Sequence, residues 1–177
     1  MEQELIYRLK QTEKSAQKEF YDLYAEKMFV IAFRYLNNEF DTGTAVNQAF
    51  LKALQNIKNF IYLGTGCLEA WLRKIVVNEA LIILRSKKDV QFIRENDMLR
   101  IKNDSNPAEN IEAEGILEMV CSLPSGYRTV FNLYVIEGYS HKEIGSMLSI
   151  TESTSRSQLN RARILLQEII KEKNYTL

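Results

Sequence analysis

Apolar residues recur at intervals of three and four along most of the chain, which is the spacing of one face of an α-helix. The predicted helices cover residues 2–11, 15–36, 44–56, 68–85, 111–122 and 125–135. Gly and Pro are few, and alternation of β-branched with polar residues is scarce. We therefore expect an all-α chain.

Two more helices, separated by a very short turn, are predicted within residues 139–167. Ser140 and Glu143 have the spacing of a capping box, in which each side chain bonds the backbone N–H of the other residue. Ser149 to Thr151 suit a tight turn, and Thr151 suits the N-cap of the second helix. This arrangement is a helix-turn-helix, whose second helix enters the major groove of DNA.

The second helix of this pair has one apolar side and one side suited to DNA. The apolar side holds Leu159, Ala162, Leu165, Leu166 and Ile169. The outer side holds Thr154, Arg156, Ser157, Asn160, Arg161 and Arg163. Arg bonds guanine through two N–H groups, Asn does the same for adenine, and hydroxyls suit bases or phosphates. The periodicity alone is equally typical of a helix pair with a solvated charged face.

Residues 86–110 interrupt the helical pattern with mixed charge, Asn, Ser and a proline, which is typical of a flexible tether. We therefore expect two small helical domains joined by a flexible linker, the second a four-helix domain that contains the helix-turn-helix. The expected boundaries are 1–88 for the first domain, 89–110 for the linker and 111–177 for the second domain.

The net charge of zero conceals an uneven distribution. Residues 1–88 carry 13 Lys and Arg against 10 Asp and Glu, and residues 119–177 carry 7 against 5. The intervening residues 89–118 carry 3 against 8. Neither basic block is strong enough for tight phosphate binding by itself, so the composition favours a DNA-binding subunit of a larger assembly over a free-standing repressor.

The sequence shows no arrangement typical of a catalytic centre. There is no phosphate-binding glycine loop, no paired carboxylates and no nucleophile with a base, so we expect no enzyme, no cofactor and no metal. His141, the single histidine, falls in the first turn of a helix and is expected at the surface. Cys67 and Cys121 are expected as reduced structural thiols. With no leader and no spanning run, a cytoplasmic protein is expected.

The C-terminal motifs resemble the promoter-binding region of bacterial RNA polymerase sigma factors of the small, two-domain extracytoplasmic-function (ECF) group. The shared motifs are Leu123-Pro124, Arg128 to Phe131, Glu137 to Ser140, Glu143-Ile144, Thr154 to Ser157 and Arg161 to Arg163. The chain departs from this group at Ser149 and Ser153, where glycine is more common.

The N-terminal half resembles the core-binding and promoter-melting region of the same family. The matching positions are Phe20 to Tyr24, Phe50, Trp71-Leu72, Ile75, Asn78 and Arg85. Gly43, Thr44 and Gln48 replace acidic residues of the face that docks on the polymerase clamp, Val77 replaces a basic residue, and Ile82 replaces an aspartate. These changes leave core docking and minus-ten contacts less well supported than the C-terminal motifs.

The resemblance implies a sigma factor that recognises two promoter elements. At the minus-35 element the implied contact residues are Arg156, Ser157, Asn160, Arg161, Thr154, Arg163 and Lys142. At the minus-ten element they are Asn78, Phe60, Ile61, Tyr62, Leu63, Arg73, Lys74 and Arg85. On core polymerase they are Thr44, Val46, Asn47, Gln48, Phe50 and Leu51.

The partners implied by the family are core RNA polymerase, promoter DNA and an anti-sigma factor, with no small-molecule substrate. Two alternatives remain open. One is a stand-alone helix-turn-helix regulator that works without polymerase. The other is an interaction protein of sigma ancestry with weakened polymerase docking, which the neutral segment from Thr42 to Gln48 favours.

Overall fold

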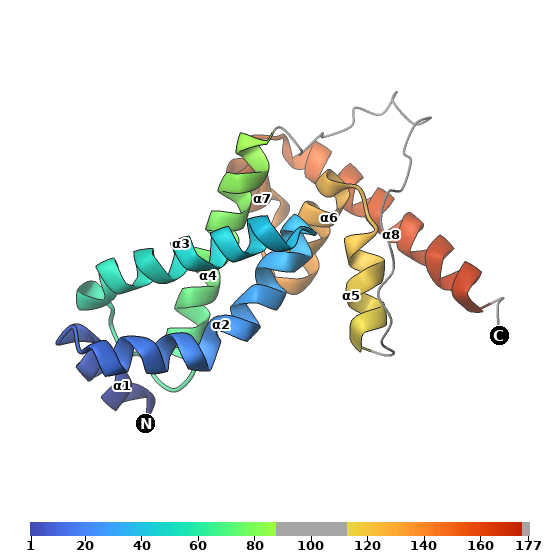
Figure 1. Cartoon of the computed structure of the whole chain (residues 1–177). Coiled ribbons are helices and arrows are strands. Elements are labelled where there is room, and N and C mark those ends of the chain that lie inside the picture. Colours follow the sequence, from blue (N-terminus) through green and yellow to red (C-terminus); the bar gives the residue numbers. More distant parts are fainter. Residues whose placement is uncertain (88–112, 175–177) are drawn as a thin grey trace. The chain divides into compact units, whose positions relative to one another are not determined.

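The computed structural model describes residues 1–87 and 113–174. The chain divides into two compact units, Met1–Lys87 and Lys88–Leu177 (Figure 1). Every regular element in the two described stretches is helical, which confirms the all-α prediction. None of these helices combines the length and apolarity that crossing a membrane requires. The expected linker over 89–110 lies outside the described residues.

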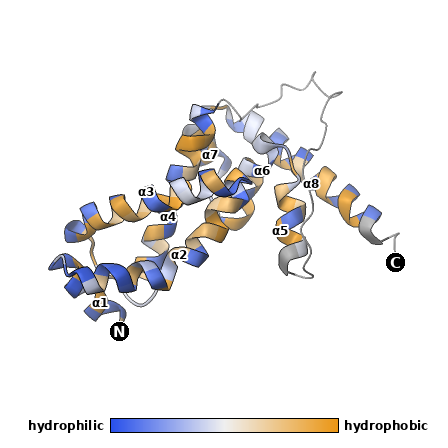
Figure 2. Cartoon of the chain, in the orientation of Figure 1, coloured by the Kyte–Doolittle hydropathy of each residue, from blue (hydrophilic) through white to orange (hydrophobic). Residues whose placement is uncertain are grey.

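The first unit is a bundle in which α2, α3 and α4 pack against one another, while α1 lies against α2 and the short 3₁₀ turn η1. Its elements are α1 (Glu2–Lys10), α2 (Lys14–Leu36), α3 (Glu39–Asn56), η1 (Ile57–Asn59) and α4 (Cys67–Ser86). Apolar and polar residues alternate along these ribbons at helical spacing (Figure 2). Burial of the apolar stripes holds the bundle together.

The helix α2 supplies much of this core. The ring of Phe20 is fully buried and meets Phe50 of α3 edge-on, with centroids 5.1 Å apart. Leu23 of the same helix is 55% exposed because it falls at the margin of the apolar stripe. The helix begins at Lys14, one residue before the predicted start at Ser15, and Glu13 occupies the N-cap position.

Two asparagines separate α2 from α3, as the sequence predicted. Asn37 adopts a left-handed conformation with φ of 48°, which asparagine tolerates better than most residues. The side-chain oxygen of Asn38 then accepts a hydrogen bond from the Asp41 N–H. Because Asn38 caps the helix, α3 begins at Glu39, and the predicted start near Thr44 was wrong.

Two ion pairs connect α3 to α4. Lys87 Nζ lies 2.7 Å from Asp41 Oδ1, and Lys52 Nζ lies 2.7 Å from Glu79 Oε1. Asp41 and Glu79 are both buried, so each lysine offsets the cost of removing a carboxylate from water.

The second unit places α8 against α5, α6 and α7. Its elements are α5 (Ala113–Cys121), α6 (Ser125–Phe131), the π turn η2 (Asn132–Ile136), α7 (His141–Leu148) and α8 (Glu152–Asn174). The core contains Leu123, Tyr127 and Ala162, with Phe131, Leu165 and Leu166 packed around them. Ile116, predicted to face inward, is 62% exposed on the short helix α5.

A buried arginine connects α5 to α6. Arg128 Nη1 donates to the carbonyl oxygens of Cys121 at 2.8 Å and Leu123 at 3.0 Å. Cys121 is the last residue of α5 and Leu123 lies in the turn after it, where backbone acceptors lack helical partners. The arginine of the Arg-x-Val-Phe motif therefore has a structural role in this chain.

Candidate nucleic-acid interface

The turn between α7 and α8 is built as the sequence predicts. Ser140 and Glu143 form the capping box, with the Ser140 N–H donating to Glu143 Oε2 at 2.8 Å. Thr151 Oγ1 accepts from the Thr154 N–H at 3.0 Å, as expected of the N-cap of α8. Ser149 has φ of 56°, the left-handed conformation that glycine adopts most easily, which accounts for the glycine common at this family position.

The turn closes tightly over α7 because Gly145 has no side chain. A Cβ at this position would lie 2.9 Å from the carbonyl oxygen of Ile150. The Ile150 N–H in turn donates to the Gly145 carbonyl at 3.0 Å. This close backbone contact fixes the angle at which α8 leaves the turn.

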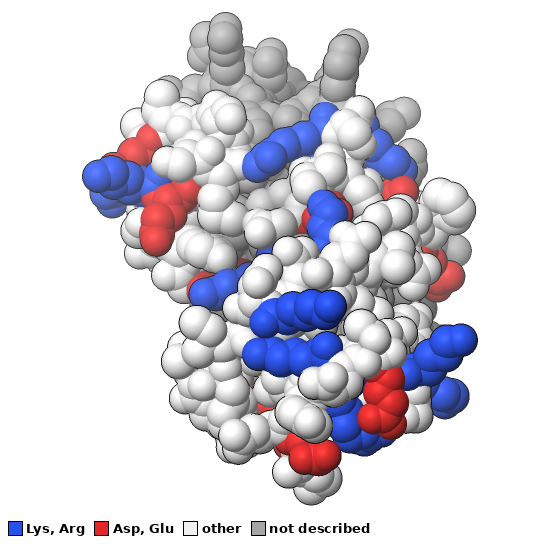
Figure 3. Space-filling view, turned by 90° about the vertical axis from the view of Figure 1, so that its left-hand side faces the viewer, with Lys and Arg blue, Asp and Glu red and all other residues white. Residues whose placement is uncertain are grey.

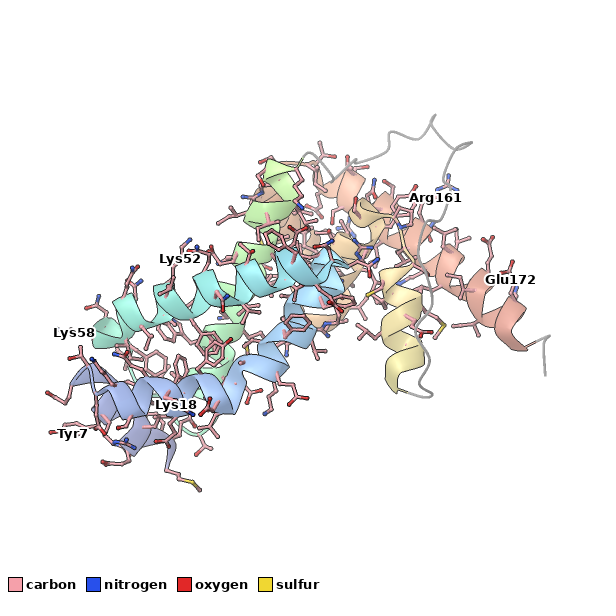
Figure 4. The ribbon with its side chains drawn as sticks, in the orientation of Figure 1. Tyr7, Lys18, Lys52, Lys58, Arg161 and Glu172 are labelled. Atoms are coloured by element: carbon pink, nitrogen blue, oxygen red, sulfur yellow. The ribbon has the colours of Figure 1, made fainter. Side chains whose placement is uncertain are left out.

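The outer side of α8 presents most of the residues predicted to contact DNA. Arg156, Asn160 and Arg163 are exposed, and so is Lys142 at the start of α7. The half-buried members of the predicted set are Thr154, Ser157 and Arg161, the last labelled in Figure 4. Arg156 is ion-paired with Glu152 one turn earlier, so its guanidinium is held along the helix surface.

His141 corrects the expectation of a surface histidine. Its ring is buried and stacks on Tyr134, with centroids 4.3 Å apart. Its Nδ1 lies 2.9 Å from the hydroxyl oxygen of the buried Ser155, so a hydrogen bond joins α7 to α8. The sequence did not identify Ser155 or Tyr134 as partners, because they come from other elements.

The surroundings of His141 disfavour its charged form. Burial lowers the pKa of His141 below its ordinary value, and the positive charges of Arg156 and Arg163 lower it further. Glu152 acts in the opposite direction, with an effect on the pKa smaller than that of Arg156 and larger than that of Arg163. The residues that would contact DNA therefore also influence the histidine that joins the two helices.

In the first unit, the loop between η1 and α4 exposes part of the predicted base-capturing set. Ile61 and Leu63 are 73% and 85% exposed, and Tyr62 is half-buried. Phe60 is buried, with its ring 4.8 Å from that of Trp71. Phe60 therefore cannot receive a base on its ring, and its predicted contact role is corrected to support of the loop.

An open groove of about 590 Å³ lies between α3 and α4. It brings together two of the predicted minus-ten residues, Asn78 and Arg85, with aromatic and aliphatic walls. Its remaining lining residues are Lys52, Asn56, Trp71, Ile75, Glu79, Leu81 and Ile82. Apolar walls with a few polar edges are what an unstacked base requires.

Basic residues surround this part of the first unit. Lys52 and Lys58 lie on the second half of α3 and on η1 (Figure 4), and neither was predicted from the sequence as a contact residue. On the face shown in Figure 3, lysine and arginine side chains lie among uncharged and acidic ones. Of the predicted cations on α4, Lys74 and Arg85 are exposed and Arg73 is half-buried.

The residues predicted to dock on polymerase divide by burial. Thr44, Asn47, Gln48 and Leu51 are exposed on α3. Val46 and Phe50 are 3% and 4% exposed. These two side chains point into the core, so their predicted role as contact residues is corrected to support of the exposed face.

Within residues 1–87 and 113–174, no three His, Cys, Asp or Glu side chains come close enough together to hold a metal ion. Both cysteines are free thiols, with Cys121 buried and Cys67 half-buried. The clusters that the structure does assemble are the outer side of α8 and the groove between α3 and α4.

Comparison with known proteins finds similarity to RNA polymerase sigma factors. The family described as Sigma-70, region 4, matches residues 113–166. The ECF RNA polymerase sigma factor SigW of Bacillus subtilis is 26% identical over 190 residues, which cover 97% of this chain and 100% of that protein. SigE of Mycolicibacterium smegmatis, also named an ECF RNA polymerase sigma factor, is 26% identical over 157 residues; the match covers 83% of this chain and spans 58% of that relative.

Among solved structures, the fold is similar to that of the sigma factor RpoE of Bartonella quintana, solved in complex with the anti-sigma factor NepR. The TM-score is 0.52 at 22% sequence identity, with 87% of this chain and 96% of that chain covered. The family match over residues 113–166 contains α7, the turn after it and α8 as far as Leu166.

Proposed function

We propose that the chain is a member of the ECF family of RNA polymerase sigma factors, which direct promoter-specific initiation of transcription, and that its two units divide promoter recognition between them. The second unit binds the upstream duplex element, and the first binds core polymerase and the opened strand downstream. In this role the chain supplies specificity and positioning, and the polymerase supplies the chemistry.

The outer side of α8 carries this proposal. Arg156, Asn160 and Arg163 are exposed on a helix that begins directly after a capped, tight turn. A helix held in this way can place its N-terminal side chains against base edges in the major groove. Ser157 and Arg161 would contact bases beside them, while Thr154 and Lys142 would contact phosphates.

The groove of the first unit supports capture of the opened strand. A base taken out of the stack would lie against Trp71 and Ile75, with Asn78 and Arg85 at the polar edge. The loop residues Ile61, Tyr62 and Leu63, with the cations Arg73 and Lys74, would guide the strand toward the groove. Phe60 is omitted from the contact set because it is buried.

Partner binding by the first unit is supported by its exposed apolar residues. Leu51 on α3 and Leu23 on α2 are 53% and 55% exposed. With the neutral polar residues Thr44, Asn47 and Gln48, Leu51 would form a docking face for core polymerase. An anti-sigma factor that covers part of the same apolar surface would block docking on core polymerase. The chain would act in the cytoplasm, because the polymerase is there.

Reconstituted transcription tests the proposal. Purified chain added to core polymerase is expected to give transcripts from a subset of genomic promoters, while core enzyme alone gives none. The triple variant Arg156→Ala, Asn160→Ala, Arg163→Ala is expected to bind core polymerase normally and to lose promoter selection. A chain that does not bind core polymerase would contradict the proposal.

The neutral docking face favours one alternative, an interaction protein that no longer binds polymerase tightly. Gly43, Thr44 and Gln48 of α3 stand where acidic residues are common in the family. Co-purification with core polymerase separates the two functions. Tight duplex binding without polymerase would instead favour a stand-alone regulator.

A further inference from the structure

The helix α1 holds both ends of the loop over residues 60–66. The carboxylate of Glu2 accepts hydrogen bonds from the Gly66 N–H at 2.6 Å and the Leu68 N–H at 2.8 Å. At the other end of α1, Lys10 Nζ donates to the carbonyl oxygen of Phe60 at 2.7 Å. One short helix thus contacts the beginning and the end of a loop about 50 residues further along the chain.

The contact from Glu2 replaces a cap that α4 does not have of its own. The N-cap residue of α4 is Gly66, which has no side chain and has φ of 87°. The first N–H groups of a helix need acceptors, and a carboxylate there also interacts favourably with the helix dipole. Glu2 provides both from a helix remote in sequence, so α1 and the start of α4 are fixed relative to each other.

Between these two anchors the loop presents apolar side chains to solvent. Ile61 is 73% exposed and Leu63 is 85% exposed. Phe60, at the Lys10 anchor, packs on Trp71, which lines the groove between α3 and α4. The anchors therefore fix where the exposed residues stand relative to the groove, and such preorganisation is what a binding loop needs.

We propose that Glu2 and Lys10 are positioning residues for promoter opening, holding the 60–66 loop in the conformation that guides the unstacked base into the groove. The proposal rests on the proposed function of the first unit. It assigns to α1 a role in strand capture although no residue of α1 lines the groove.

Amide exchange in the full-length chain tests the anchoring. In Glu2→Ala, exchange at the Gly66 and Leu68 amides is expected to become about tenfold faster or more, because both lose a charged acceptor. Glu4→Ala, in the same turn of α1, is the matched control and should leave both amides unchanged. Unchanged exchange at Phe50 in the core of α3 would show that the bundle stays folded.

Promoter opening tests the role of the anchoring. With core polymerase and a responsive promoter, Glu2→Ala and Lys10→Met are expected to slow opening, measured by permanganate reactivity at the minus-ten element, by about tenfold. Lys10→Arg keeps a donor and should restore most of the rate. Binding to core polymerase and to the upstream duplex should be unaffected.

Two results would overturn the proposal: equal exchange in Glu2→Ala and Glu4→Ala, or faster exchange with an unchanged opening rate. A wild-type chain that binds core polymerase and opens no promoter would overturn the proposed function, and the role of α1 in opening with it. Loss of opening confined to the anchor variants supports both.

Discussion

Single side chains fasten the two helices of the helix-turn-helix at the points where they meet. The hydrogen bond between His141 and Ser155 joins the start of α7 to the first turns of α8. The ring of Tyr134 covers the other side of the imidazole, and the Arg163 guanidinium lies 6.0 Å from the centroid of that ring. A change of charge at this histidine would therefore act electrostatically on residues proposed to contact DNA.

Protonation of His141 is expected to destabilise the second unit. Its pKa is lowered in the folded state, so the unfolded chain binds the proton more readily and stability rises with pH. The contribution of His141 should be complete above its ordinary pKa of about 6.5 and should be lost progressively as the pH falls below it. Urea unfolding between pH 5 and 8 measures this loss, and His141→Asn should show a flatter profile over that range.

Arg128 is expected to be essential for the stability of the same unit. Arg128→Met removes the donors to the Cys121 and Leu123 carbonyls, at an expected cost of about 1.5–3 kcal/mol. Amide exchange at Leu133 measures the effect. Tryptophan fluorescence would not report on this unit, because the single tryptophan of the chain lies in the other unit. Lys171→Met, an exposed change near the end of α8, should cost little; an equal loss in both variants would show that Arg128 has no special role.

At the scale of the elements, the short turn before α8 limits the stability of the helix pair. Ser149 holds a left-handed backbone that is unfavourable for a residue with a side chain. Ser149→Gly is therefore expected to stabilise the second unit by about 0.5–1 kcal/mol. Thermal unfolding measures the gain, with Ser146→Gly on α7 as a control that should destabilise the chain, because glycine weakens a helix interior.

A substitution on the outer side of α8 can distinguish side chains that contact bases from side chains that contact phosphates. Arg156→Ala is expected to weaken binding to the cognate upstream element by about 1–3 kcal/mol and to relax one base preference. Binding is measured by titration of the holoenzyme with cognate and scrambled duplexes. An equal loss on both duplexes would show that Arg156 contacts only phosphate.

Helical periodicity predicted the type and order of the elements well, since each helix buries one apolar stripe. The start of α3 was missed because a single short side chain, Asn38, determines it. The π turn η2 escaped prediction because it continues the pattern of α6 with only a local change of period. Boundaries set by one hydrogen bond leave little trace in a periodic pattern.

The candidate site was predicted less completely than the fold. The outer side of α8 follows from helical spacing alone, so its exposed residues could be chosen in advance. Phe60 was selected because its loop is rich in apolar residues, and Val46 and Phe50 were selected from the family resemblance. Neither criterion distinguishes a supporting residue from a contact residue. Glu2 and Lys10 were not selected, because their contacts with the 60–66 loop depend on how distant elements pack.

At the scale of the whole molecule, we expect promoter binding to depend on the linkage of the two compact units. A protease site inserted between residues 95 and 100 should leave both units folded and reduce holoenzyme-dependent transcription at least tenfold after cleavage, because each unit alone loses the effective concentration that tethering supplies. Circular dichroism before and after cleavage checks folding. Full activity of the cleaved chain would show that the polymerase alone holds the units in place.

The π turn η2 has a consequence for comparing members of this family. Its backbone closes over one extra residue, with the Glu137 N–H donating to the Asn132 carbonyl at 3.0 Å. A member lacking one residue there would continue α6 as an ordinary helix, and the position of Tyr134 would turn by about 100°. A one-residue gap between positions 132 and 136 in an alignment would thus mark the chains in which the aromatic partner of His141 is lost.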